Sequence, residues 1–192
     1  MHTYPLTEVE AVTTDQELAD WLGVDVTDPL LAAMNTTATA AVIEFLYSEL
    51  IDRERVVVYQ NWPVVGTLTG RSLSRQEAGF NPVVELPYAR LQSVTSAEVA
   101  GDLSTAYTIL DTLPSKLDFD SISIADDVPA LKVQYFAGFG TIADVPTTIK
   151  TATLMAADFM YNNRGSCSAA DALDKSGAAS ILLPYKAKAV LI

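Results

Sequence analysis

Cysteine and histidine are almost absent from this sequence. Its 192 residues include one of each, Cys167 and His2. A single cysteine excludes an intrachain disulfide, so we expect the chain to fold in a reducing compartment or without any need for oxidation. Zinc sites require several Cys or His ligands, which excludes that kind of site here. We interpret His2 as part of a mobile terminus, and Cys167 as a structural or incidental thiol rather than a nucleophile.

Positive charge is scarce as well. Lys and Arg number 12 against 24 Asp and Glu, so the formal net charge is −12, and charged residues make up only 19% of the chain. A pI of about 4.3 argues against a primary nucleic-acid binder, which needs a basic face to neutralise phosphates. The hydrophobic share of 49% excludes a disordered chain. The chain combines a high apolar content with few charges. This combination suggests that part of its surface is in contact with other copies or partners.

Long apolar runs are missing too. No segment approaches the roughly 18 uninterrupted apolar residues of a membrane span. Residues 1–10 lack the basic segment and the following apolar run of a signal peptide. We therefore expect a soluble protein without membrane association, assembled in the cytoplasm.

The motifs of common enzyme sites do not occur. Gly138-Phe139-Gly140 lacks the third glycine of a dinucleotide loop, and neither GxxxxGK[ST] nor GxSxG is present. Four aspartates near one predicted turn could bind a hard cation, but without the glycine and final glutamate of an EF-hand we interpret them as solvated turn acids. They are Asp118, Asp120, Asp126 and Asp127. We expect no enzyme, cofactor or metal site; the alternative is a metal-dependent hydrolase built on these carboxylates.

Two helices are predicted before the first strand. Residues 14–23 begin with a capping-box pattern, end in glycine and place Leu18, Trp21 and Leu22 on one face. An Asp-Pro pair, typical of an N-cap and a first helical position, begins a second helix over 28–50.

A third helix is predicted over 145–163, where a Val-Pro pair begins it. Small and polar residues predict a loop at 165–177, and 181–185 form a last apolar anchor. The helices at 28–50 and 145–163 carry few charges, which predicts burial on two sides, either within one core or between subunits.

Short β-branched and aromatic segments lie between the second and third helices. Gly, Pro and Asp clusters separate them, which predicts antiparallel hairpins rather than parallel βαβ units. The predicted strands are 56–59, 83–86, 91–99, 106–110, 117–124 and 131–136, after an irregular excursion at 66–82. This order predicts an α+β fold. We expect one domain over 1–192, with a helical body at 14–50 and 145–186, a β-rich insertion at about 56–136 and a C-terminal tail at 187–192.

Several short motifs occur in an order that is typical of one family. The third predicted helix is preceded by an aromatic-Ala-Gly-aromatic-Gly strand end and a Val-Pro start, and it closes on Tyr161-Asn162-Asn163-Arg164. Leu182-Leu183-Pro184-Tyr185-Lys186 follows, and Glu85 to Val94 contains a Leu-Pro and a Leu-x-Ser-Val element. Together these motifs resemble the tailed-phage head-to-tail connector (head-completion adaptor) family. Lys186 stands where that family has arginine, and Ala89 or Arg90 where it has a second proline.

The resemblance implies a non-enzymatic virion subunit at the head–tail interface, with a mainly helical body of three to four helices, a small antiparallel β region and extended terminal arms. Copies would form a homo-oligomeric ring, dodecameric in the particle, below the portal protein. The ring would extend the DNA channel, through which DNA passes without specific binding, and offer a docking platform for a stopper or tail-completion protein. The alternative within phage assembly is that the chain is itself a tail-completion or stopper protein.

Ring subunits contact their two neighbours through different surfaces, so we expect interface residues on the third helix, on the apolar anchor and on the tail. They are Ile149, Ala152, Phe159, Tyr161, Arg164, Leu182, Leu183, Tyr185, Val190, Leu191 and Ile192. The tail is predicted to add to a sheet edge of the portal or to a neighbouring subunit. Acidic copies around a channel would repel phosphates and let DNA slide; the alternative is that acidity keeps an apolar subunit soluble before assembly.

Overall fold

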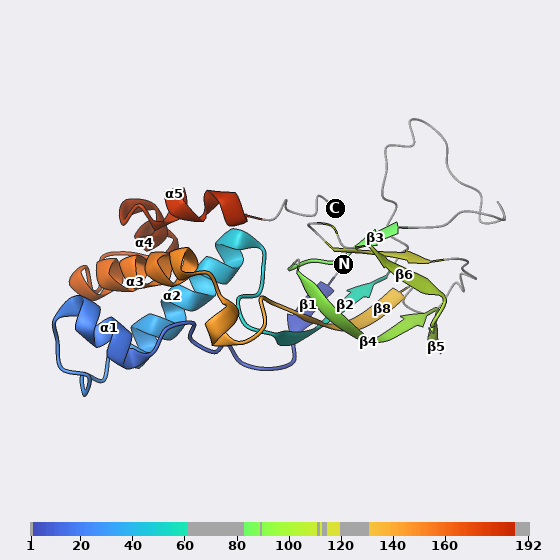
Figure 1. Ribbon diagram of the computed structural model, residues 1–192, viewed down its shortest axis with the longest axis horizontal. Helices are drawn as coiled ribbons and strands as arrows, with labels where there is room; N and C mark the ends of the chain where they lie inside the picture. Colours follow the sequence, from blue (N-terminus) through green and yellow to red (C-terminus); the bar gives the residue numbers. More distant parts are fainter. Residues whose placement is uncertain are drawn as a thin grey trace. The chain divides into compact units, whose positions relative to one another are not determined.

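The computed structural model describes residues 2–60, 83–88, 90–110, 112, 115–119 and 131–186 (Figure 1). The chain forms two compact units. A β unit consists of Met1–Leu6, Arg53–Ala137 and Lys188–Ile192, and a helical unit consists of Thr7–Asp52 and Gly138–Ala187. The predicted α+β class is confirmed. The mainly helical character is confirmed only in part, because 28% of the structure is strand, in two antiparallel sheets.

The larger sheet of the β unit has five strands in the order β1-β2-β8-β4-β5, all antiparallel. They are β1 (His2–Pro5), β2 (Arg53–Tyr59), β8 (Leu131–Ala137), β4 (Leu91–Val99) and β5 (Asp102–Leu103). Strand β8 lies at the centre and alternates strictly, with every odd-numbered residue buried on one face. Central position and alternation together make β8 the strand on which this sheet is built.

Strand β1 corrects the expectation of a mobile N-terminus. Its four residues pair with β2, from His2 opposite Val58 to Pro5 opposite Arg55. Three of its four side chains are exposed, so it has no buried face that a hydrophobic pattern could reveal. Backbone pairing with a neighbour, rather than its own side chains, makes this segment a strand.

The smaller sheet has the order β3-β7-β6 and shares a core with the larger one. Its strands are β3 (Val83–Glu85), β6 (Tyr107–Leu110) and β7 (Lys116–Phe119). The Tyr59 hydroxyl donates to the carbonyl oxygen of Glu85 at 2.7 Å, and the Tyr135 hydroxyl donates to that of Pro87 at 2.6 Å. Burial raises the pKa of Tyr59, and the charge of Glu85 raises it further. Two buried hydroxyls therefore fix the segment after β3 to the larger sheet.

Each predicted strand has a counterpart here. The excursion predicted at 66–82 and the end of the strand predicted at 117–124 lie outside the described residues.

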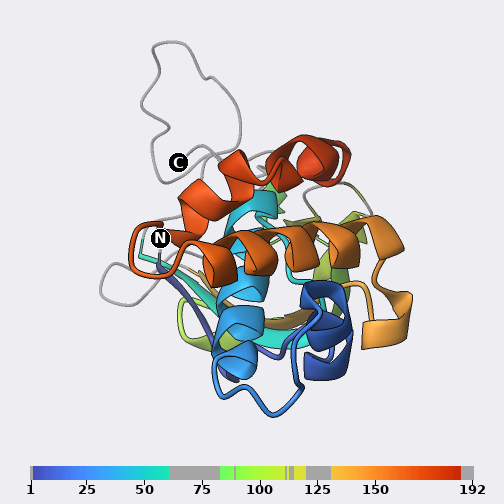
Figure 2. The ribbon, with the colours of Figure 1, turned by 90° about the vertical axis from the view of Figure 1, so that its left-hand side faces the viewer.

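The helical unit is arranged around α3 (Thr147–Asn162), which packs against all four other helices (Figure 2). Those are α1 (Asp15–Leu22), α2 (Leu31–Leu46), α4 (Ala169–Lys175) and α5 (Ala178–Leu182), with 3-10 turns η1 (Ile142–Asp144) and η2 (Leu183–Tyr185). The predicted capping box of α1 is confirmed: Thr14 Oγ1 accepts from the Glu17 amide at 3.1 Å, and Glu17 accepts from the Thr14 amide at 2.7 Å. None of the described helices is long and apolar enough to cross a bilayer.

Helix α2 begins later than predicted. Asp28 caps a turn first, because its side chain accepts from the Leu30 amide at 2.9 Å and its carbonyl oxygen accepts from the Leu31 amide at 3.2 Å. The helix ends at Leu46, since Tyr47 takes a left-handed conformation with φ +53°.

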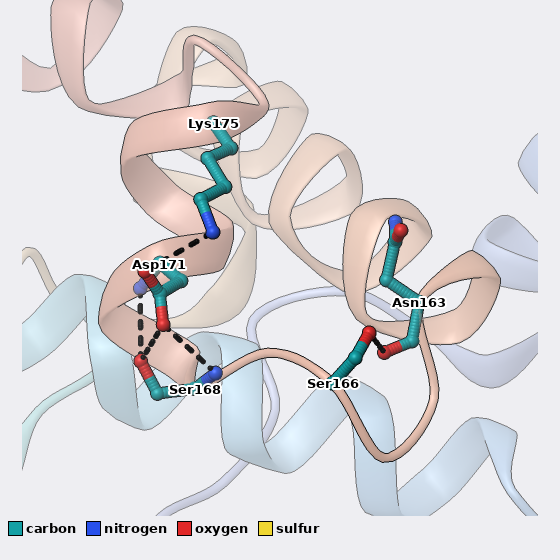
Figure 3. Close-up of polar contacts among 5 residues, drawn as sticks. All are labelled: Asn163, Ser166, Ser168, Asp171 and Lys175. Carbon is teal, nitrogen blue, oxygen red and sulfur yellow. Dashed lines mark hydrogen bonds and ion pairs between the residues drawn. The ribbon is translucent and has the colours of Figure 1, made fainter.

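The loop predicted at 165–177 contains α4, so this prediction was wrong over seven residues. Ser168 and Asp171 form a capping box: Ser168 Oγ accepts from the Asp171 amide at 3.1 Å, and Asp171 accepts from the Ser168 amide at 3.2 Å (Figure 3). Lys175 pairs with Asp171 at 3.4 Å one turn later. The Ser-x-x-Asp spacing is the signal that identifies this helix in the sequence.

Candidate protein–protein interface

Three of the predicted interface residues lie inside the helical unit. Ile149 and Ala152 on α3 and Leu182 at the end of α5 are fully buried. Helices α1, α2, α4 and α5 all pack against α3, which accounts for the low charge of this helix without a second subunit. These three side chains stabilise the unit from within.

The other described members of the predicted set retain exposed surface. Leu183 in η2 is 60% exposed and Arg164 after α3 is exposed, whereas Phe159, Tyr161 and Tyr185 are half-buried. Val190, Leu191 and Ile192 lie outside the described residues. The exposed members are therefore the ones that another protein can reach.

Tyr161 connects the C-terminal end of α3 to the turn before α2. Its hydroxyl donates to Asp28 Oδ2 at 2.6 Å, and this hydrogen bond raises the pKa of Tyr161 while it lowers that of Asp28. The Arg164 guanidinium lies 3.8 Å from the Tyr161 ring centroid, and its Nε donates to the Tyr161 carbonyl oxygen at 2.7 Å. The Tyr-x-Asn-Arg motif therefore ties two helix ends together and holds an exposed arginine in place.

The Asp28–Tyr161 hydrogen bond predicts a pH-dependent stability. The folded pKa of Asp28 is lowered from its ordinary value of 3.8, so its contribution is present above that value and is lost as the pH falls through the lower folded pKa. We expect Tyr161→Phe to unfold at a lower temperature than the wild type at pH 7, with a difference that shrinks below pH 3.8. Thermal unfolding followed by circular dichroism across this range tests it.

Tyr185→Phe is the matched control, because it removes a tyrosine hydroxyl elsewhere in the helical unit. If the wild type and Tyr161→Phe differ in unfolding temperature by the same amount from neutral to strongly acidic pH, that result contradicts a stabilising role of the Asp28–Tyr161 hydrogen bond.

The end of η2 is fixed by a similar contact. The Lys186 ammonium group lies 4.3 Å from the centroid of the Phe45 ring near the end of α2. Lysine at this position therefore makes a cation–π contact, whereas the family that the sequence resembles has arginine there.

One exposed apolar surface was not predicted. The sequence places Trp21 on the buried face of α1 with Leu18 and Leu22, yet Trp21 is 47% exposed, while Leu18 is fully buried and Leu22 half-buried. Val26, in the connection to α2, is 44% exposed. The spacing of apolar residues in the sequence identifies the apolar side of α1. Only the structure shows how much of that side α2 and α3 cover.

The acidity of the chain is concentrated in the helical unit. This unit contains fourteen Asp and Glu against four Lys and Arg, a formal charge of −10, whereas the β unit contains ten against eight, a charge of −2.

The structure describes three of the residues considered for other chemistry, Asp118, Cys167 and His2. Among the described residues, no three His, Cys, Asp or Glu side chains are grouped so that they could hold a metal ion. Asp118 lies in β7 with one buried oxygen that has no hydrogen-bond partner; Asp120, Asp126 and Asp127 lie outside the described residues. Cys167 is a free thiol, and His2 lies against Tyr4 with ring centroids 5.4 Å apart. The hydrolase alternative stays untested.

No family model and no curated protein matches this sequence. Solved structures do match over its full length. A chain from the neck of a native GTA particle computed with C12 symmetry is 19% identical, with a TM-score of 0.70, covering 100% of this chain and 98% of that one. The fold is that of a gene transfer agent neck chain. A neck chain from an empty particle computed with C6 symmetry has the same TM-score and coverage at 16% identity.

A chain from the virion of a native gene transfer agent (GTA) particle also matches, with a TM-score of 0.68, 17% identity and the same coverage. The neck-chain fold thus extends over both units of the present chain. It is consistent with the resemblance of the sequence to head-to-tail connectors.

Proposed function

We propose that this chain is a structural protein of a phage-like virion and acts as a head-to-tail connector. The observation that carries the proposal is the full-length likeness to neck chains, with a TM-score of 0.70. The connector motifs fall at the ends of defined elements: the strand end after β8, the start of α3 and its last turn. A non-enzymatic role follows from this assignment.

A ring of copies, twelve in the assembled particle, is the proposed working form. The neck structures that share the fold were computed with C6 and C12 symmetry, which supports a closed ring for this chain. The ring lies below the portal protein, extends the DNA channel and offers a platform to a stopper or tail-completion protein. Val190, Leu191 and Ile192 dock the tail on the portal or on a neighbouring copy.

DNA passes this ring without specific binding. The charge of −10 on the helical unit supports this role, because carboxylates repel phosphates wherever they face the channel. Replacing channel-facing acids by amides is then expected to change DNA retention or ejection, whereas acids that serve solubility alone would leave both unchanged.

Electron microscopy of the purified chain, alone and mixed with its portal protein, tests the connector role. We expect rings in the first sample or rings on portal in the second. A chain that binds only to a ring already completed by another protein would instead be a stopper, and a monomer in every mixture would contradict both roles.

A further inference from the structure

The few cations of the helical unit are confined to one part of the sequence. Residues 1–52 contain ten Asp and Glu and no Lys or Arg. Three of the four cations of the unit follow α3 in the sequence: Arg164, Lys175 and Lys186. The same part of the unit contains only two carboxylates, Asp171 and Asp174. The unit therefore has a purely acidic N-terminal part and a slightly basic C-terminal part.

The acidic part carries an exposed aromatic residue. We define the Trp21 surface as Glu17, Asp20, Trp21, Asp25 and Val26, all of them exposed. Its carboxylates are held in place by local hydrogen bonds, Glu17 by the Thr14 amide at 2.7 Å and Asp25 by the Thr27 amide at 2.9 Å. An exposed tryptophan among fixed carboxylates is suited to an apolar contact flanked by cations, because tryptophan is among the residues that contribute most to protein interfaces.

The basic part presents such an apolar group. We define the α5 surface as four exposed residues that flank α5: Lys175 at the end of α4, and Leu183, Pro184 and Lys186 after α5. Leu183 is the most exposed large apolar side chain described in the helical unit, at 60%. The Lys186 ammonium group is oriented by the Phe45 ring, whose centroid lies 4.3 Å away. The charge and apolar character of this surface complement those of the Trp21 surface.

The elements that carry or adjoin the two surfaces lie on opposite sides of α3. In Figures 1 and 2, α1 lies below α3, and α4 and α5 lie above it. Two different surfaces on opposite sides of one unit are the requirement for head-to-tail association, in which each copy uses one surface toward each neighbour.

We propose that copies of this chain associate head to tail, with the α5 surface of one copy on the Trp21 surface of the next. The inference rests on the proposed ring and assigns its subunit contact. Two chains of charge −12 repel one another over most of their surface, so contact is favoured where the α5 surface supplies positive charge. Neither surface includes the buried residues Ile149, Ala152 and Leu182.

Two single variants and their mixture test the proposal. Trp21→Ala removes the anchor of one surface, and Leu183→Glu places a charge in the other. Each variant alone is expected to lose rings in native mass spectrometry, with a dissociation constant of the subunit contact at least roughly 30-fold higher than in the wild type. Mixed in equal amounts, they retain one intact contact between them and should form dimers that grow no further.

Asp20→Lys supplies a second variant of the Trp21 surface, in case Trp21→Ala folds poorly. Asp20 is exposed on α1, where it accepts a hydrogen bond from the side-chain amide of Gln16 at 2.7 Å. Glu10→Lys makes the same change of charge at an exposed residue outside both surfaces. We expect Asp20→Lys to weaken ring formation and Glu10→Lys to leave it unchanged.

The possible failures are distinguishable. If the wild type forms rings, and Asp20→Lys and Leu183→Glu form them equally well, this contact is overturned and the connector role stays intact. That conclusion holds even if either surface then proves to bind another protein. Full rings in the mixture of Trp21→Ala and Leu183→Glu would also overturn this contact. A wild-type chain that stays monomeric at every concentration and with portal present would overturn the proposed function together with this contact.

Discussion

Replacing Gly138 with alanine is expected to lower the free energy of unfolding by about 3 kcal/mol or more, or to prevent folding. A Cβ atom on Gly138 would lie 2.6 Å from the backbone nitrogen of Asp52 and 2.6 Å from the backbone carbon and oxygen of Ile51. The obstacle is main chain, which cannot turn aside as a side chain can. Gly138 also has φ +151°, a conformation that residues with a Cβ rarely adopt.

The backbone next to Gly138 is fixed on both sides, so it cannot move to make room. The Phe139 amide donates to the Leu50 carbonyl oxygen at 3.2 Å, and the Asp52 amide donates to the Gly140 carbonyl oxygen at 2.8 Å. A shift that relieves the contact breaks at least one of these hydrogen bonds. The Gly-aromatic-Gly motif thus serves close packing of two chain segments.

Gly165→Ala is the matched control for this prediction. Gly165 also has a positive φ, +79°, but a Cβ there would meet no atom within 4 Å. We expect it to cost about 1 kcal/mol, the strain of the left-handed backbone alone. Urea unfolding of both variants measures the difference; equal losses would show that backbone conformation rather than the close approach makes Gly138 necessary.

Replacing Ile149 with alanine is expected to cost about 2–5 kcal/mol of stability. Ile149 is fully buried on α3, which the other helices cover, so truncation leaves a cavity rather than a smaller contact surface. Leu183→Ala is expected to change stability by no more than about 0.5 kcal/mol, because Leu183 is 60% exposed. The two residues therefore differ in kind, although the sequence assigns both to one interface.

Chemical unfolding and sedimentation of both variants separate the two roles. Ile149→Ala should unfold at lower denaturant concentration, whereas Leu183→Ala should unfold like the wild type and associate more weakly. An Ile149→Ala chain of wild-type stability would contradict its place in the core, and an unstable Leu183→Ala chain would contradict the free surface of η2.

Local patterns predicted the elements of this fold well where a chemical signal marks their ends. The capping box at Thr14 and the Val-Pro pair before α3 locate helices to within two residues. The sequence patterns missed two elements. Strand β1 forms because its backbone pairs with β2, and α4 begins at a capping box of Ser168 and Asp171 that the prediction overlooked.

The candidate interface was harder to predict, for a physical reason. Periodicity shows that one side of a helix is apolar, but it does not show which other segment covers that side. The apolar residues of α3 are covered in part by α4 and α5, one of them inside a predicted loop, so Ile149 and Ala152 became core. Trp21 shows the opposite case: α2 and α3 both pack against its helix, yet this side chain stays 47% exposed.

The division of the chain between its units has a consequence for biosynthesis. After β1, a ribosome delivers α1 and α2, then the 85 residues of Arg53–Ala137, and only afterwards the helices that complete the core of the helical unit. At about 5–20 residues per second, α1 and α2 wait roughly 6–23 s until α3 has been synthesised. The β unit, by contrast, can pair β8 with β2 and β4 as soon as β8 emerges, because β1, β2 and β4 precede it. The helical unit therefore completes its core last, although its first two helices are synthesised before most of the β unit.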